Sequence, residues 1–168
     1  MKEIEIKIIK SFLKYKNEKT FINKLKYILK KEIGFKLFTL TVMHPNNKFV
    51  TRIYSSNTKA YQVGGEKKIP NNYWAKVTLK DKKSFIGNNK KQIEKYFYDH
   101  RIISDLGCES ILNQVIVFND KTIGTMNLLN NANHFKKKHL ILTNFVSKFL
   151  IPIYLSYRLI DLEGSFIC

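Results

Sequence analysis

Two β-rich runs, residues 110–118 and 122–129, lie next to each other in the sequence with the turn residues Asn119-Asp120 between them. An Asn-Asp turn between two such runs is a strong local signal for an antiparallel hairpin. An earlier pair, residues 37–43 and 49–55, is joined by His44-Pro45-Asn46-Asn47, which is also a turn sequence. The chain is therefore predicted to build an antiparallel sheet, whose apolar faces other elements must cover.

The covering elements are predicted to be helices. Apolar residues recur at helical spacing from Ile4 to Leu13, from about 19 to 33, and from about 136 to 162, where Pro152 is expected to kink or break the last helix. The middle of the chain is irregular from 58 to 72, then carries a short helix with Trp74 and another helix over about 90–103. This order predicts an α+β fold with terminal helices on one face of the sheet. The helix-loop insertion is expected to cover the other face or to leave a pocket there.

Length and composition favour one globular domain, 1–168. The formal net charge is +17, but only three of the 30 basic residues are arginine, the residue that nucleic-acid sites favour. Lysine, asparagine and isoleucine are all abundant and all have A/T-rich codons, so a compositional bias with a solvated basic surface is the preferred interpretation, and nucleic-acid binding is disfavoured.

Cysteine content and hydropathy point to a cytoplasmic protein without a membrane span. Cys108 and Cys168 are too few for a disulfide framework. The N-terminal residues form no apolar signal-peptide segment, and the apolar run 149–155 is too short to cross a bilayer.

The segment 106–129 also carries a resemblance. It contains a small residue, a strand, a polar turn and a strand that opens with Ile123-Gly124, and Phe135 and a long helix follow. In these features and in element order the chain resembles the GAF family, which is related to the profilin and PAS folds, over about residues 17–158. The resemblance implies a pocket between one sheet face and the insertion, binding of small effectors such as cyclic nucleotides, bilins, haem or amino acids, and homodimers formed through the terminal helices. With no output module in the sequence, the chain is expected to be a stand-alone copy.

Departures from the family pattern narrow the range of ligand classes to be expected. Cyclic-nucleotide-binding members carry an acidic pair after the phenylalanine, where this chain has Lys136-Lys137-Lys138, so a cyclic nucleotide is not expected. Bilin-binding members use a specific cysteine within a larger photosensory array, which one isolated unit of this length does not match. No cofactor is therefore predicted.

The resemblance also leaves one enzymatic alternative open. Free-methionine-sulfoxide reductases are stand-alone GAF enzymes that need an attacking thiolate and a resolving thiol. Cys108 lies just before a predicted strand and could be activated by His100 or Arg101, with Cys168 folding back as its partner. The other interpretation is that Cys108 is a small buried hydrophobic residue.

The other motifs give weaker indications of function. The run Gly64-Gly65-Glu66-Lys67-Lys68 lacks the ending and context of a phosphate loop and is interpreted as a turn. The four histidines have no metal-ligand spacing, so no metal is predicted. Tyr98, Asp99 and His100 are adjacent, but neighbouring helical residues point in different directions and do not form a site by spacing alone.

The better candidates are polar residues in buried strands and aromatic residues of the hairpin and insertion. Asn113 and Gln114 interrupt an apolar strand, and a buried amide must find hydrogen-bond partners. The predicted ligand-binding set, for which plain core packing is the alternative, is Tyr54, Tyr61, Trp74, Phe85, Tyr98, Cys108, Ser110, Asn113, Thr125 and Asn127. The leading hypothesis is a small-molecule-binding sensory or regulatory domain that changes conformation or partner when its ligand binds. A redox enzyme using Cys108 is the alternative, and a nucleic-acid binder is the third.

Overall fold

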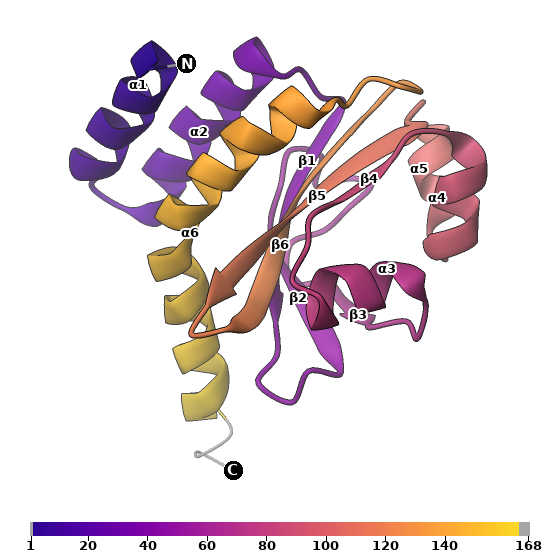
Figure 1. The fold of residues 1–168 in the computed structure, drawn as a ribbon. Coiled ribbons are helices and arrows are strands. Elements are labelled where there is room, and N and C mark those ends of the chain that lie inside the picture. The colour runs from indigo at the N-terminus through magenta and orange to yellow at the C-terminus, as the bar shows by residue number, and fades with distance from the viewer. Residues whose placement is uncertain (1, 165–168) are drawn as a thin grey trace.

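A six-stranded antiparallel sheet forms the centre of the molecule (Figure 1). The computed structural model describes residues 2–164. The strand order is β3-β2-β1-β6-β5-β4. The strands are β1 Leu37–Met43, β2 Phe49–Ser55, β3 Glu66–Lys68, β4 Phe85–Gly87, β5 Ser110–Phe118 and β6 Lys121–Asn130. Both predicted hairpins are present, and the two three-residue edge strands, β3 and β4, were not predicted.

Helices lie on both sides of this sheet. The terminal helices α1 Lys2–Leu13, α2 Glu18–Glu32 and α6 Lys137–Gly164 lie on one side, and α3 Tyr73–Ala75, α4 Lys90–Tyr96 and α5 His100–Asp105 lie on the other (Figure 1). A π-helical turn, Lys76–Lys80, continues α3. The α+β arrangement predicted from the sequence, with the terminal helices on one face of the sheet and the insertion on the other, is thus confirmed.

The helix predicted over 90–103 is two helices. Phe97 is extended, with φ −123° and ψ 116°, and this ends α4. The ring of Phe97 then packs against Trp74 and Phe85, with centroid distances of 5.6 and 6.3 Å. Burial of this aromatic side chain outweighs the local preference for a continuous helix, and the break places Tyr98 and Asp99 in the short connection to α5.

Alternation along the strands separates two cores. In β1, Phe38, Leu40 and Val42 face the terminal helices and belong to the larger core, whereas Thr39 and Thr41 face the insertion. A second apolar cluster joins the insertion to that other face: Leu37, Tyr61, Trp74, Phe85, Ile93, Ile103, Cys108, Ile111 and Leu129. The polar β1 residues therefore lie between the sheet and its insertion.

Of the predicted kink or break at Pro152, the kink is present: α6 runs through Pro152 as one element, and its axis changes direction between its two halves (Figure 1). Pro152 is exposed, so its ring lies on the outer side of the helix. Residues 137–159 of α6 are long and apolar enough to cross a membrane by length and composition. In this fold the same helix contributes Leu142, Val146, Leu150, Ile153 and Tyr154 to the core.

Candidate ligand-binding pocket

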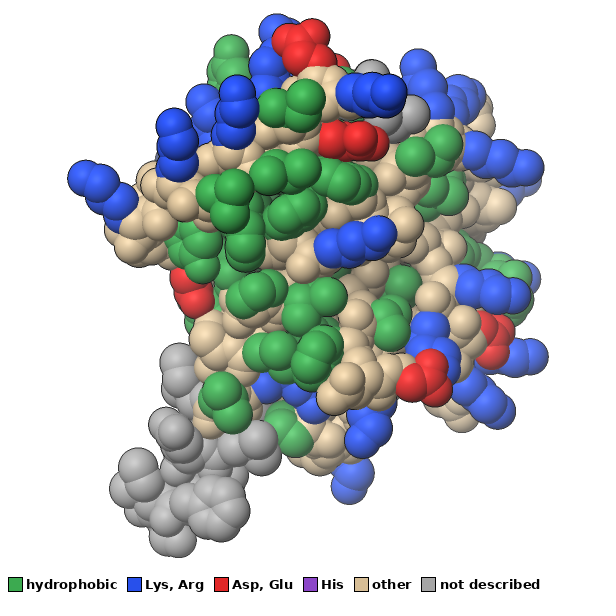
Figure 2. Space-filling view, turned by 60° about the vertical axis from the view of Figure 1, so that its left-hand side comes forward, with side chains coloured by type: hydrophobic (Ala, Val, Ile, Leu, Met, Phe, Trp, Pro, Cys, Tyr) green, Lys and Arg blue, Asp and Glu red, His purple; other side chains and the backbone are tan. Residues whose placement is uncertain are grey.

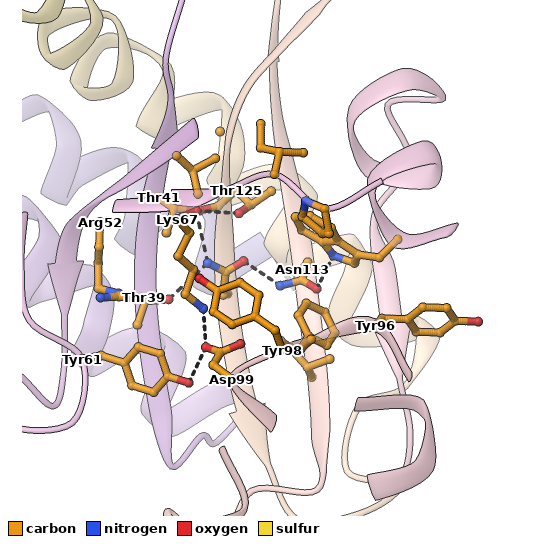
Figure 3. Close-up of a pocket in the computed structure, with 18 of the residues that line it drawn as sticks. Thr39, Thr41, Arg52, Tyr61, Lys67, Tyr96, Tyr98, Asp99, Asn113 and Thr125 are labelled. Atoms are coloured by element: carbon orange, nitrogen blue, oxygen red, sulfur yellow. Dashed lines mark hydrogen bonds and ion pairs between the residues drawn. The ribbon is translucent and has the colours of Figure 1, made fainter. Parts of the chain in front are cut away.

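A cavity of about 90 Å³ lies between the insertion and the face of the sheet that carries Thr39 and Thr41 (Figure 3). Its floor comes from β1, β2, β5 and β6, and its walls come from β3, α3 and the connection between α4 and α5. A volume of about 10–15 Å³ holds one water-sized group. The cavity therefore has room for more than one such group and suits a small molecule.

A row of polar side chains crosses the floor of this pocket. Asn113, Asn127 and Thr39 lie opposite one another on β5, β6 and β1. The Asn113 amide donates to Asn127 Oδ1 at 2.7 Å, and the Asn127 amide donates to Thr39 Oγ1 at 3.1 Å. Next to this row, the hydroxyls of Thr41 and Thr125 share a hydrogen bond of 2.8 Å. The strand register thus places the whole row, because directly paired residues project on the same side of a sheet.

The insertion contacts this row through the indole of Trp74. Asn72 caps α3 by accepting a hydrogen bond from the Ala75 amide, and the helix so started carries Trp74 over the sheet. The indole Nε1 donates to Asn113 Oδ1 at 2.9 Å. Trp74 is the only tryptophan of the chain, which makes it a natural optical probe of the pocket.

Charged residues occupy the end of the pocket near β2 and β3. The Asp99 carboxylate accepts hydrogen bonds from the Tyr61 hydroxyl at 2.7 Å and from the Lys67 ammonium, with which it forms an ion pair. The Arg52 guanidinium stacks on the Tyr61 ring at 4.6 Å, and its Nη1 donates to the Gln62 carbonyl at 2.8 Å. Figure 3 shows these four side chains grouped at one end, away from Asn113.

In this group of side chains, burial and charge pairing shift the pKa values in opposite directions. Burial raises the pKa of the Asp99 carboxyl, but the Lys67 charge and the hydrogen bonds from Lys67 and Tyr61 lower it more, so the pKa lies below its ordinary value. Burial lowers the pKa of Arg52, and its electrostatic interactions with Tyr61 and Asp99 offset this only in part. Burial followed by the Asp99 charge raises the pKa of the Tyr61 hydroxyl, which stays a neutral donor.

Six of the ten predicted ligand-binding residues line this cavity: Tyr61, Trp74, Tyr98, Asn113, Thr125 and Asn127. Phe85 and Cys108 belong to the apolar cluster behind the pocket wall. The Ser110 hydroxyl donates to the Asn131 carbonyl at 2.5 Å and does not line the cavity.

Tyr54 lies on the opposite face from the one predicted, and a β-bulge is the reason. Simple alternation would place Tyr54 and Arg52 on the same face of β2. The register shifts here, because Leu40 pairs with Tyr54 whereas Thr41 pairs with Arg52. Tyr54 therefore packs against Phe38 on the side of the terminal helices, with ring centroids 5.3 Å apart, and Arg52 enters the pocket.

Cys108 does not meet the requirements of a redox nucleophile. Its side chain is buried, and burial raises the pKa of the thiol to about 11. A reactive thiolate needs exposure and a lowered pKa. Its proposed partner, Cys168, lies outside the described residues. Among the described residues, no three His, Cys, Asp or Glu side chains are grouped as metal ligands.

Reasoning from the sequence missed the charged end of the pocket. Arg52, Lys67 and Asp99 come from three separate segments, and the turn at Gly64-Gly65 brings β3 beside Arg52, whose backbone N–H donates to the Gly65 carbonyl at 3.0 Å. One feature of the sequence points there: Arg52 lies within a predicted strand and is one of only three arginines in a chain with 27 lysines.

Solved structures of several GAF domains share this architecture. The GAF domain of a phosphoenolpyruvate-protein phosphotransferase from Coxiella burnetii superposes with a TM-score of 0.70 at 13% identity, over 97% of this chain and 95% of that one. The chain has the GAF-domain fold. The phycocyanobilin-bound GAF domain of a cyanobacterial phytochrome gives a TM-score of 0.67 at 13% identity and covers 96% of both chains. A type II free methionine-R-sulfoxide reductase from Thermoplasma acidophilum gives 0.59 at 12% identity, over 77% of this chain and 85% of that one. No family model and no curated protein matches the sequence.

The Ile-Gly feature of the GAF resemblance has a local cause in this chain. A Cβ atom on Gly124 would lie 2.2 Å from the Thr41 carbonyl oxygen and 2.4 Å from Cε1 of Tyr154. Glycine at this position lets the Tyr154 ring of α6 lie directly on the sheet, where its hydroxyl donates to the Thr125 carbonyl at 2.9 Å. The motif thus joins α6 to the strand that carries the pocket residue Thr125.

Proposed function

We propose that this GAF domain is a sensory or regulatory module that binds a small molecule in the cavity beneath its insertion. The observation that carries the proposal is the set of buried polar and charged side chains that meet around one cavity. Two of the similar solved GAF domains hold biliverdin or phycocyanobilin, which makes a small-molecule ligand a reasonable expectation for this fold. The cavity is far too small for a tetrapyrrole or a nucleotide, and this favours a smaller ligand.

Thr125 offers a route from this pocket to the terminal helices. Its hydroxyl bonds to Thr41 on the cavity side, and its carbonyl accepts from Tyr154 of α6 on the other side of the sheet. A ligand that binds more tightly to one arrangement of Thr41 and Thr125 would favour the conformation of β6 in which that arrangement occurs. Because Tyr154 bonds to β6, α6 would move with this strand. By this route, ligand binding would change the contacts that the terminal helices make with a partner.

The test is a small-metabolite screen by thermal shift, with Trp74 fluorescence as the local reporter. A matched pair of variants separates pocket binding from surface binding: Ile103→Phe narrows the cavity, whereas Ile102→Phe changes its exposed neighbour. We expect a hit to stabilise the wild type and the Ile102→Phe variant and to lose its effect in Ile103→Phe. A complete screen without stabilisation, or hits that Ile103→Phe binds unchanged, would contradict the proposal.

We further propose that the chain, 1–168, acts as one cytoplasmic unit and pairs with a second copy through α1 and α6. Figure 2 shows hydrophobic side chains gathered on one face of the molecule, with lysines around them. On α1, Ile9 and Leu13 are 37% and 74% exposed, and on α6 Ile141 is 56% exposed. Exposed apolar side chains grouped in this way favour association. Sedimentation analysis should find a dimer that Leu13→Glu disrupts and Val63→Glu, at an exposed loop position, does not.

The same face bears on the nucleic-acid alternative, which stays disfavoured. Its lysines surround the apolar centre instead of forming a continuous groove (Figure 2). A nucleic-acid site would show a steep fall in affinity with salt. We expect only weak, salt-sensitive binding to an oligonucleotide, which a filter-binding titration at two salt concentrations would measure.

A further inference from the structure

The charges around the pocket do not balance. The cavity is lined by three basic side chains, Arg52, Lys67 and Lys68, and by one acidic side chain, Asp99. Asp99 already accepts from Lys67 and Tyr61, so the charge of Lys67 is neutralised within the protein. Lys68 is exposed to solvent. The remaining charge belongs to Arg52, which is only 7% exposed.

Arg52 also has unused hydrogen-bonding capacity. A guanidinium has five N–H donors, and among the described residues its side chain donates only to the Gln62 carbonyl. Its face is covered by Tyr61, and its Nη1 is held close to Gly65, where an added Cβ atom would lie only 3.0 Å away. The group is therefore fixed in place before any ligand arrives, and a planar, fixed guanidinium pairs best with a carboxylate.

The opposite end of the cavity has different chemistry. Trp74, Ile111 and Leu129 line it, and all are buried apolar residues of α3, β5 and β6. The strand order places two strands, β1 and β6, between Arg52 on β2 and Ile111 on β5. At about 4.8 Å a strand, the charged and apolar ends are roughly 14 Å apart along the floor, and the threonine and asparagine row lies between them.

We propose, building on the function proposed above, that the ligand is a small organic carboxylate with an apolar body. Its carboxylate pairs with Arg52, and its apolar body extends from there along the floor in the direction of Trp74, beside the hydroxyls of Thr41 and Thr125. The ligand carries one net negative charge, because one buried positive charge in the pocket lacks a partner. The small volume of the cavity favours a short ligand.

The experiment compares molecules of one shape and different charge. Benzoate and valerate are titrated against their neutral amides and against benzylamine, with Trp74 fluorescence and thermal shift as readouts. We expect the carboxylates to bind at least tenfold more tightly than the amides and benzylamine not to bind. Arg52→Gln should lose at least tenfold in carboxylate affinity, Arg52→Lys should lose less, and Arg101→Gln, which removes an exposed arginine outside the pocket, should bind as the wild type does.

Stability provides a control for folding. Arg52→Gln removes a buried charge without an ion-pair partner, but also the hydrogen bond to Gln62 and the stacking on Tyr61, so the unliganded variant should still melt cooperatively and within a few degrees of the wild type, which shows that its lost binding is not due to unfolding. Equal binding of amides and carboxylates, binding of benzylamine, or unchanged binding in Arg52→Gln would overturn the assignment while leaving a small-molecule sensor in place. If no carboxylate binds but the wider screen finds another ligand, the assignment again fails alone. If nothing stabilises the protein at all, the proposed function fails with it.

Discussion

Substituting Gly124 tests the closest contact between the sheet and α6. In Gly124→Ala, the new methyl group would lie 2.2 Å from the Thr41 carbonyl oxygen and 2.4 Å from the Tyr154 ring. The first neighbour is backbone in the middle of a sheet, and the second is a fully buried ring, so neither can move away cheaply. Overpacking a core costs about 1–3 kcal/mol. Because this substitution makes two such contacts, we expect it to lower the unfolding free energy by about 3 kcal/mol. For a chain of this size, that lowers the melting temperature by roughly 6–12 °C.

Urea denaturation followed by circular dichroism measures this loss of unfolding free energy. Gly64→Ala is the matched control, since an added methyl group there meets nothing within 4 Å and only the positive φ of 81° opposes it, at about 1 kcal/mol. In a Tyr154→Leu background, Gly124→Ala should cost less than in the wild type, because one of its two contacts is gone. If Gly124→Ala is no more destabilising than Gly64→Ala, the close approach of α6 to the sheet is not as described.

Three further outcomes are expected from the same protein. Asp99→Asn should lower the unfolding free energy at pH 7 by about 2–4 kcal/mol, because it leaves the Lys67 ammonium without its partner. Since folding lowers the pKa of Asp99, the advantage of the wild type is complete above the ordinary aspartate value of about 3.9 and is lost as the pH falls through the lower, folded-state pKa, as urea titrations across pH would record. In a Cys168→Ser background, the folded protein should react slowly with a thiol reagent at pH 8, because the pKa of Cys108 is raised to about 11, and rapid labelling would refute its burial. Pro152→Ala should stabilise the protein by about 1–3 kcal/mol by restoring a helical hydrogen bond at an exposed position, and a lower melting temperature would contradict this.

The parts of the fold that were predictable depend on local signals. The two hairpins follow from turn residues between β-rich runs, and α2 begins where Asn17 accepts a hydrogen bond from the Thr20 amide. The edge strands β3 and β4 could not be predicted, because each has only three residues and its strand character comes from its neighbour. The break at Phe97 likewise depends on rings that are distant in sequence.

The pocket residues also divide into those that local sequence signals reveal and those that depend on distant contacts. Asn113 and Asn127 could be predicted as site candidates because a polar amide within an apolar strand is visible in one sequence. Asp99 and Lys67 could not, since their pairing depends on how the insertion folds over the sheet. Tyr54 was predicted as a pocket residue, but one extra residue in β2 shifts the register and turns its side chain to the other face of the sheet, which one sequence does not reveal.

The two faces of the sheet differ in a way that stability alone does not explain. On the side covered by the terminal helices, the buried amide oxygen of Gln114 accepts a hydrogen bond from the Thr143 hydroxyl of α6, so it helps to dock that helix. On the pocket side, Thr41 and Thr125 bond mainly to each other, next to a cavity. Replacing a hydrogen-bonded buried pair by apolar groups of similar shape is close to neutral, so such a pair adds little to folding. A face made only for stability would be filled and apolar, whereas polar groups that adjoin an unfilled space are those that a ligand can engage. This asymmetry favours binding as the role of the cavity face, whichever ligand it takes.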